Sequence, residues 1–214
     1  MKVAVIFLGA PGSGKGTQSR HLMQKHAIPV LGMGDLLRKE SKKNNETSRY
    51  LAKLLEKGEI IPWSLTRQIF ENNIHRFFQK SIVILDGVPR NVEQARDIDH
   101  ILSNQGFDQV KVIYLDVSIS TIQHRLSHRL VCMNCQAPFS DEDFVACPFC
   151  AHTETQIRPD DNIDSIQNRI DAHQKSMDEL LKHYQRKNTL SRIDANQDIQ
   201  QVQQNVRICI KNLL

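Results

Sequence analysis

The first seventeen residues constrain the fold more than any other part of the chain. An apolar, β-branched run, Lys2–Leu8, leads directly into the glycine-rich stretch GAPGSGKGT, Gly9–Thr17, and a helical pattern follows over Gly16–His26. A strand, a glycine loop and a helix in this order begin a βαβ unit, which favours a parallel sheet covered by helices. Glycines also let backbone N–H groups turn toward an anion at the start of the helix. The stretch therefore predicts a phosphate-binding loop in an α/β fold.

The loop contains the elements that a nucleoside triphosphate requires. Lys15 is placed to reach the terminal phosphates, and a hydroxyl follows at Thr17, one residue later than in the general pattern because Gly16 intervenes. A glycine-rich turn without a ligand is the alternative, and the strand before the loop and the helix after it argue against that alternative. The residues that we expect to bind ATP here are Gly12, Ser13, Gly14, Lys15, Gly16 and Thr17.

The remaining apolar patterns extend the same fold class. Further strands are predicted at Ile28–Leu31, Ser81–Leu85, Val110–Leu115 and Leu190–Ile193. Longer helices are predicted at Ser64–Phe78 with Ser64 as N-cap, at Val92–Asn104, at Ile119–Leu130, and from Asp160 or Asp161 onward. We expect a five-stranded parallel sheet flanked by helices. In the C-terminal helix, Cys209 shares the apolar face and is interpreted as a core thiol.

Two Cys-x-x-Cys pairs stand eleven residues apart in the middle of the chain, and their cysteines are Cys132, Cys135, Cys147 and Cys150. Four thiolates form a closed tetrahedral set, which is typical of a structural zinc site. A redox dithiol is the weaker alternative. A zinc-ribbon nucleic-acid binder is another alternative, but the segment 137–152 carries acidic residues and no Lys or Arg.

The composition limits the remaining function classes. The chain has 214 residues, 40% of them hydrophobic and 24% charged, which suits one α/β domain with insertions. Its longest apolar runs are too short to span a bilayer, and Val3–Leu8 is interpreted as a buried strand rather than a signal peptide. With cysteines in metal-ligand spacing, we expect a cytoplasmic protein. A net charge of +4 is too mild to indicate nucleic-acid binding.

Four more segments stand in order along the chain. They are GMGDLLR (Gly32–Arg38), LDGVPRNVEQA (Leu85–Ala95), HRLSHR (His124–Arg129) and RPDDNIDSIQNR (Arg158–Arg169). Together with the GKGT ending of the loop, these segments resemble the nucleoside monophosphate kinases, and specifically adenylate kinases with a zinc-binding lid. The resemblance implies reversible, Mg²⁺-dependent, in-line phosphoryl transfer from ATP to AMP in an arginine-lined cleft, giving two ADP. It also implies a monomer that binds neither nucleic acid nor a membrane.

The resemblance further implies a division of the chain into three parts. Residues 1–31, 62–130 and 159–214 would form the core domain. Residues 32–61 would form the helical insertion that binds the monophosphate. Residues 131–158 would form the zinc-binding lid, which closes over the triphosphate and excludes water.

Each matched position carries an implied role. Arg38 and Arg90 hold the monophosphate, and Lys15 follows the phosphoryl group. Asp86 orients waters on Mg²⁺, although a turn cap is its alternative role. The other residues implied for ATP are Arg125, Arg129 and Gln197, and those implied for AMP are Met33, Ile60, Gly87, Gln94, Arg158 and Arg169. The residues implied in catalysis are Lys15, Asp86, Arg90, Arg129, Arg158 and Arg169.

Basic residues at these positions also explain the charge. Lys15 and the six arginines exceed the net charge, so the basicity belongs to one cleft. An arginine's planar fork suits phosphate oxygens. Two aspartates, Asp160 and Asp161, either orient arginines of the lid or serve only as helix N-caps.

The acceptor base is less firmly specified than the reaction. An amide at Gln94 can pair with adenine and favours AMP, since pyrimidine-preferring relatives typically carry Asn. Met33 stands where the family usually has Thr or Ser, and Val88 where it usually has Phe or Leu. We therefore expect AMP kinase activity with looser acceptor selection. The alternatives are a kinase for CMP, UMP or GMP, a nucleotide-sensing protein with a degenerate site, and a non-enzymatic zinc-ribbon protein regulated by ATP.

Overall fold

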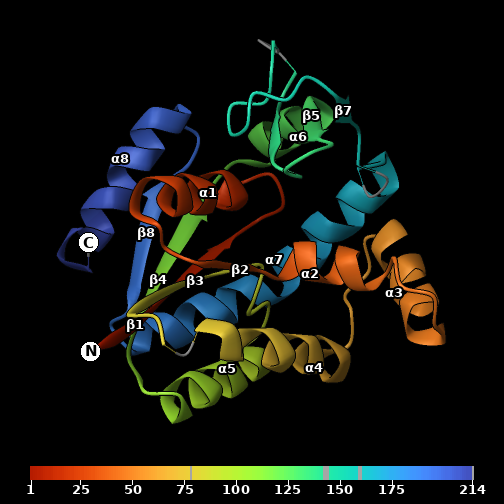
Figure 1. Ribbon diagram of the computed structural model, residues 1–214. Coiled ribbons are helices and arrows are strands. Elements are labelled where there is room, and N and C mark those ends of the chain that lie inside the picture. Colours follow the sequence, from red (N-terminus) through yellow and green to blue (C-terminus); the bar gives the residue numbers. More distant parts are fainter. Residues whose placement is uncertain (78, 142–144, 159–160, 214) are drawn as a thin grey trace.

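A parallel sheet with helices on both faces forms the body of the molecule (Figure 1). The computed structural model describes residues 1–77, 79–141, 145–158 and 161–213. Five parallel strands lie in the order β2-β3-β1-β4-β8. They are β1 (Lys2–Gly9), β2 (Val30–Gly32), β3 (Ile82–Asp86), β4 (Phe107–Asp116) and β8 (Leu190–Asp194). The predicted α/β fold with a five-stranded parallel sheet is confirmed.

The central strand β1 shows why both faces are covered. Its side chains alternate across the sheet, as the geometry of a strand requires. Ala4, Ile6 and Leu8 enter one core with apolar residues of the helices on one face, whereas Val3, Val5 and Phe7 enter a second core with apolar residues of the helices on the other face. Cys209 packs against this second core, as predicted. A strand apolar on both faces is stable only between two helical layers.

The helices connect the strands. Their bounds are α1 (Lys15–His26), α2 (Met33–Glu40), α3 (Glu46–Glu56), α4 (Trp63–Ile74), α5 (Val92–Asn104), α6 (Ile119–Ser127), α7 (Ile163–Arg186) and α8 (Ile199–Ile210). Short 3₁₀ turns follow α4 at His75–Phe77 and α8 at Lys211–Leu213. None of the helices within the described ranges is long and apolar enough to cross a membrane.

Three predicted helix boundaries were wrong. Helix α4 begins at Trp63 behind Pro62, so Ser64 lies inside the helix rather than at its N-cap. Helix α6 ends at Ser127, and the chain turns into a strand that already contains Arg129. The N-cap of α7 is Asn162, whose side chain accepts a hydrogen bond from the Ser165 N–H at 2.8 Å, and not Asp161. Asp160 lies outside the described residues.

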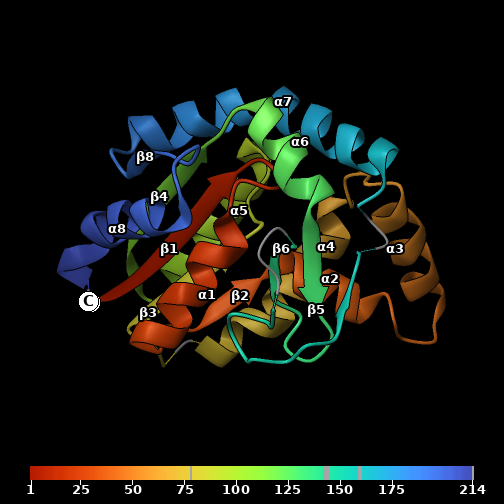
Figure 2. The same ribbon diagram turned by 90° about the horizontal axis from the view of Figure 1, so that it is seen from above.

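A second, smaller sheet is built from the segment around the cysteines. Its antiparallel strands lie in the order β6-β5-β7, with β5 at Arg129–Cys132, β6 at Pro138–Ser140 and β7 at Thr155–Gln156. Figure 2 shows this segment from above, with β6 beside α1. Arg20 on α1 donates hydrogen bonds to the carbonyl oxygens of Cys135 at 3.4 Å and Gln136 at 3.2 Å. Gln24 donates to the Phe149 carbonyl oxygen at 3.1 Å, so the segment docks on α1.

Candidate active site

A cavity of about 1310 Å³ opens at the carboxyl ends of the parallel strands. Gly9, Gly32 and Asp86, which all belong to its lining, end β1, β2 and β3. Asp86 lies in register with Phe7 of β1 and with Gly32 of β2. Ligands of open α/β sheets bind at this edge, where loops from several strands converge.

The glycine-rich loop forms one wall of the cavity. Gly12 and Gly14 adopt left-handed backbone conformations, with φ of 80° and 96°, that glycine enters without a steric penalty. Gly14 is the N-cap of α1, so the helix begins immediately behind the loop with its N–H groups free of capping side chains. The predicted loop residues Gly12, Ser13, Gly14, Lys15, Gly16 and Thr17 all line the cavity. The loop and the helix N-terminus together favour an anion.

Lys15 is held inside this loop. Its Nζ donates hydrogen bonds to the carbonyl oxygens of Gly9 at 2.7 Å and Ala10 at 2.8 Å. Burial, together with the charges of Arg90 and Arg169, lowers the pKa of Lys15 to about 8, while Asp86 acts in the opposite direction. At pH 7 the ammonium group is therefore still about nine-tenths protonated.

Asp86 is the acidic group of the same wall. Burial raises the pKa of Asp86, whereas the charge of Lys15 opposes that shift. Its carboxylate faces the start of α1, since a Cβ on Gly16 would lie 3.6 Å from Asp86 Oδ2. A carboxylate beside a triphosphate-binding loop fits Mg²⁺, which prefers one or two carboxylates together with substrate phosphate oxygens.

The six arginines that the resemblance assigns to nucleotide binding come from four parts of the chain and converge on this cavity. They are Arg38, Arg90, Arg125, Arg129, Arg158 and Arg169. Asp161, whose side chain is only 1% exposed, binds two of them. It accepts from Arg129 through both carboxylate oxygens and from Arg169 Nη1 at 3.3 Å. Of its two predicted roles, Asp161 therefore orients arginines and does not cap the helix.

Three other arginines are fixed by neighbours of their own. Arg38 donates to Asp35 Oδ1 at 2.6 Å, and Arg125 donates to the Gln197 carbonyl oxygen at 3.3 Å. Arg90, which is exposed to the cavity, donates from Nε to the Gly87 carbonyl oxygen at 3.3 Å. Loss of solvation in the cavity, reinforced by Arg169, lowers the pKa of Arg90 to about 10, so its guanidinium stays charged at neutral pH.

Some of the other residues implied in AMP or ATP binding line the cavity, and others are buried in the core. Ile60, Gly87 and Gln197 line the cavity. Met33 is fully buried and packs with Leu37 and Leu51 in the larger core. Gln94 is also buried, and its Oε1 accepts a hydrogen bond from the Arg90 backbone N–H at 2.8 Å. Neither Met33 nor Gln94 is among the described residues that line the cavity.

Arg20 and His173 are among the lining residues that were not predicted from the sequence. The guanidinium of Arg20 lies 3.5 Å from Asp35 Oδ2. In both cases the helical spacing in the sequence could have predicted the residue. Arg20 lies one turn after Gly16 on α1, and His173 lies one turn after Arg169 on α7, so each shares a helix face with a residue already assigned to the cleft.

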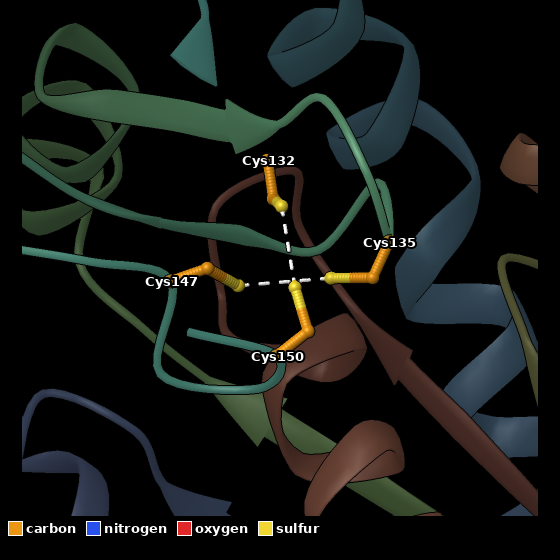
Figure 3. A group of neighbouring side chains, drawn as sticks. All are labelled: Cys132, Cys135, Cys147 and Cys150. Atoms are coloured by element: carbon orange, nitrogen blue, oxygen red, sulfur yellow. Dashed lines mark hydrogen bonds between the residues drawn. The ribbon is translucent and has the colours of Figure 1, made fainter. Parts of the chain in front are cut away.

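The four cysteines meet at one point (Figure 3). Their Sγ atoms all lie within 4.8 Å of one another, with Cys132 and Cys150 3.5 Å apart and Cys135 and Cys147 3.6 Å apart. All four are free thiols. A tetrahedral zinc with Zn–S bonds of about 2.3 Å separates its sulfurs by about 3.8 Å. The set therefore fits zinc and argues against a pair of disulfides.

The backbone around the cysteines supports the same interpretation. Each Cys-x-x-Cys turn closes with one hydrogen bond, from Gln136 N–H to the Cys132 carbonyl oxygen and from Ala151 N–H to the Cys147 carbonyl oxygen. Gln136 and Ala151 adopt the same left-handed conformation, with φ of 58° and 59°. The two turns thus repeat one geometry, which presents four sulfurs to a common centre.

Comparisons with known proteins agree with the site. The sequence model of the family described as adenylate kinase matches residues 7–189. An adenylate kinase of Limosilactobacillus reuteri is 31% identical over 98% of this chain and 99% of its own length. Those of Dehalococcoides mccartyi and Chlamydia trachomatis serovar D are 33% and 34% identical, over 97% and 94% of this chain and over 97% and 87% of their own lengths. The chain belongs to the adenylate kinase family, an enzyme family of ATP:AMP phosphotransferases.

Proposed function

We propose that this protein catalyses ATP + AMP ⇌ 2 ADP. The observation that carries the proposal is that one cavity is lined both by the glycine-rich loop with its Lys15 and by the six predicted arginines. Two nucleotides bring many negative oxygens together, and only a cleft with this density of positive charge neutralises them. A protein that merely binds ATP would not need arginines on the acceptor side of the loop.

The transfer itself requires positioning more than covalent chemistry. Arg38 and Arg90 would hold the monophosphate in line with the triphosphate. Arg129, Arg158 and Arg169 would surround the transferring phosphoryl group, and Lys15 would accompany it from donor to acceptor. Arg125 would pack on the donor adenine, near Gln197. The ion pairs of Asp161 support these roles because they fix two of the guanidinium groups before substrate arrives.

Two metal ions complete the proposal. Asp86 would hold Mg²⁺ through its waters beside the triphosphate; the ion supplies positive charge to the phosphate oxygens. Cys132, Cys135, Cys147 and Cys150 would hold a structural zinc, because a segment this short cannot build a core of its own. Phe139 and Phe149, which pack against the cysteines, supply the remaining apolar contacts.

The three predicted parts of the chain take distinct tasks. Residues 1–31, 62–130 and 159–214 would form the core, residues 32–61 the acceptor-binding insertion and residues 131–158 the lid. Closure of the lid would exclude water, which otherwise competes with the monophosphate as acceptor. We also propose that the protein acts as a monomer in the cytoplasm, as the family resemblance predicts.

One observation favours a second candidate, a monophosphate kinase with relaxed acceptor selection. Met33 and Gln94 are buried, and the Gln94 oxygen is already bonded to the Arg90 backbone. A buried side chain whose polar atom is already hydrogen-bonded within the protein does not read the acceptor base, so it discriminates poorly between bases.

Formation of diphosphate from ATP and each of AMP, CMP, UMP and GMP tests both candidates. We expect AMP to have the highest kcat/KM, with measurable turnover of at least one other monophosphate. A higher value for CMP than for AMP would overturn the AMP assignment. Absence of turnover with all four would overturn the enzymatic proposal.

A further inference from the structure

His173 is a polar residue of the cleft to which the reaction outlined above gives no role. It lies on α7, one turn after Arg169, and lines the cavity together with its neighbours Ala172, Ser176 and Met177. Among the residues that the structure describes, none forms a hydrogen bond or an ion pair with its imidazole. A half-buried imidazole without a protein partner, facing a cavity that receives polar ligands, has its hydrogen-bonding capacity available for the ligand.

Two positive groups of the same cavity act electrostatically on His173, Lys15 from the start of α1 and Arg90 from the segment after β3. Arg169, one turn earlier on α7, lines the cavity as well. Ser176, one turn further along α7, donates a hydrogen bond from its hydroxyl to the Arg90 carbonyl oxygen at 2.8 Å. This bond anchors the His173 face of α7 to the segment that carries Arg90. The imidazole is therefore held where the monophosphate and the transferring phosphoryl group are expected to meet.

The environment also sets the protonation state of the ring. Burial lowers the pKa of His173 to about 3, and the charges of Lys15 and Arg90 contribute to the shift. The imidazole is neutral at pH 7, with one N–H to donate and one nitrogen to accept. A neutral ring adds no further positive charge to an already cationic cleft, yet it still offers a donor to an anion.

We propose that His173 contacts the substrate and donates a hydrogen bond to a phosphate oxygen of the nucleotides bound between Lys15 and Arg90. This inference rests on the proposed function for its kinetic consequence, but the contact with phosphate can be measured on its own. Anionic oxygens beside the ring would offset the charges of Lys15 and Arg90, so the pKa of His173 should rise when phosphates bind.

Two substitutions separate this role from simple space filling. His173→Phe keeps a ring of similar size but removes the donor, and His173→Gln keeps a donor in a residue that does not titrate. We expect His173→Phe to lower kcat/KM for AMP about tenfold, the effect of losing one hydrogen bond to a charged group. His173→Gln should stay within about threefold of the parent. The exposed His100 on α5 provides the control, because His100→Phe should leave kcat/KM unchanged.

Side-chain ¹H–¹⁵N NMR of the intact protein tests the contact without turnover. His173→Gln identifies the His173 signals by their loss. We expect those signals to report a neutral ring at pH 6 and to shift on addition of inorganic tripolyphosphate, with titration of the ring moved to higher pH.

The inference is overturned if His173→Phe retains the parent kcat/KM, or if tripolyphosphate leaves the His173 signals unchanged. If the parent protein forms no ADP from ATP and AMP, the proposed function fails. The tripolyphosphate titration then still decides whether His173 binds phosphate.

Discussion

Arg90 and Gln94 are only four positions apart in the chain, yet their side chains lie in opposite surroundings. The guanidinium of Arg90 reaches the cavity, whereas the amide of Gln94 is buried and bonded to the backbone. The same contrast separates Arg38, which lines the cavity, from Met33, which is part of the core. A charged group is costly to bury, so it stays at the cavity, while an amide or a thioether can be absorbed by the interior. Phosphate binding is thus more robust to sequence change than base selection.

The largest effect should follow loss of charge on the phosphate side. We expect Lys15→Met to lower kcat for ADP formation by about 10³-fold, comparable to removing one preorganised group that stabilises developing charge. Steady-state kinetics measures this effect, with Lys25→Met at the exposed end of α1 as control. A loss smaller than tenfold would mean that the phosphate side is less sensitive than its charges indicate.

Asp161→Asn should reduce activity less than Lys15→Met does, but it should reduce stability more. The substitution removes the common counter-charge of Arg129 and Arg169, so both guanidinium groups lose their ion pair with this carboxylate. We expect kcat to fall about 10²-fold and the free energy of unfolding to fall by about 3 kcal/mol. Kinetics and urea denaturation provide the two measurements. Asp164→Asn, at an exposed position in the first turn of α7, should change neither.

Removal of zinc should affect the lid rather than the loop. Cys147→Ser, or treatment with a chelator, should lower Tm by at least about 5 °C. It should leave ATP binding by the phosphate loop in place, because the cysteines are not part of the loop wall. Metal analysis, thermal denaturation and calorimetry with ATP measure the three quantities. A protein that contains no zinc and melts identically with a chelator would contradict the structural-zinc proposal.

Measuring the affinity for ATP at several pH values tests the charge of Lys15 directly. Since the pKa of Lys15 is lowered to about 8, the ammonium group is lost as the pH rises through 8, and with it the attraction for phosphate. We expect Kd for ATP to increase by up to about tenfold between pH 7 and pH 9. Lys15→Arg keeps its charge over this range and should remove the inflection. A pH-independent Kd in the parent protein would contradict the shifted titration.

The smallest effect is expected on the base side. Met33→Thr restores a hydroxyl near the acceptor segment and should raise the preference for AMP over CMP about threefold. It should also lower Tm, because it removes apolar volume from a fully buried position. Met33→Leu is the control, with the preference unchanged. An unchanged preference in Met33→Thr would show that this position does not influence the acceptor base.

Local patterns in the sequence were sufficient for the α/β fold and for the loop around Lys15, whereas the arginines of the cavity were predicted from the family resemblance. Alternating apolar strands, the glycine loop and the paired cysteines each determine a local geometry, and their order specifies the sheet. Orienting arginines was one of two predicted roles of Asp161, and the sequence could not choose between them because an aspartate before a helix is equally suited to capping. The buried positions of Met33 and Gln94 depend on packing between distant elements, which no local pattern reports. Arg20 and His173 could have been found from helical spacing.

Arg20 has a consequence for how the molecule can move. Its guanidinium donates to carbonyl oxygens of the cysteine-bearing segment and also pairs with Asp35 of α2, which in turn holds Arg38. One cation therefore links the cysteine-bearing segment to α2. Any movement of this segment away from α1 has to break the Arg20 hydrogen bonds, and the released guanidinium would then compete with Arg38 for the Asp35 carboxylate. A displacement of the cysteine-bearing segment would in this way alter the ion pair that holds Arg38.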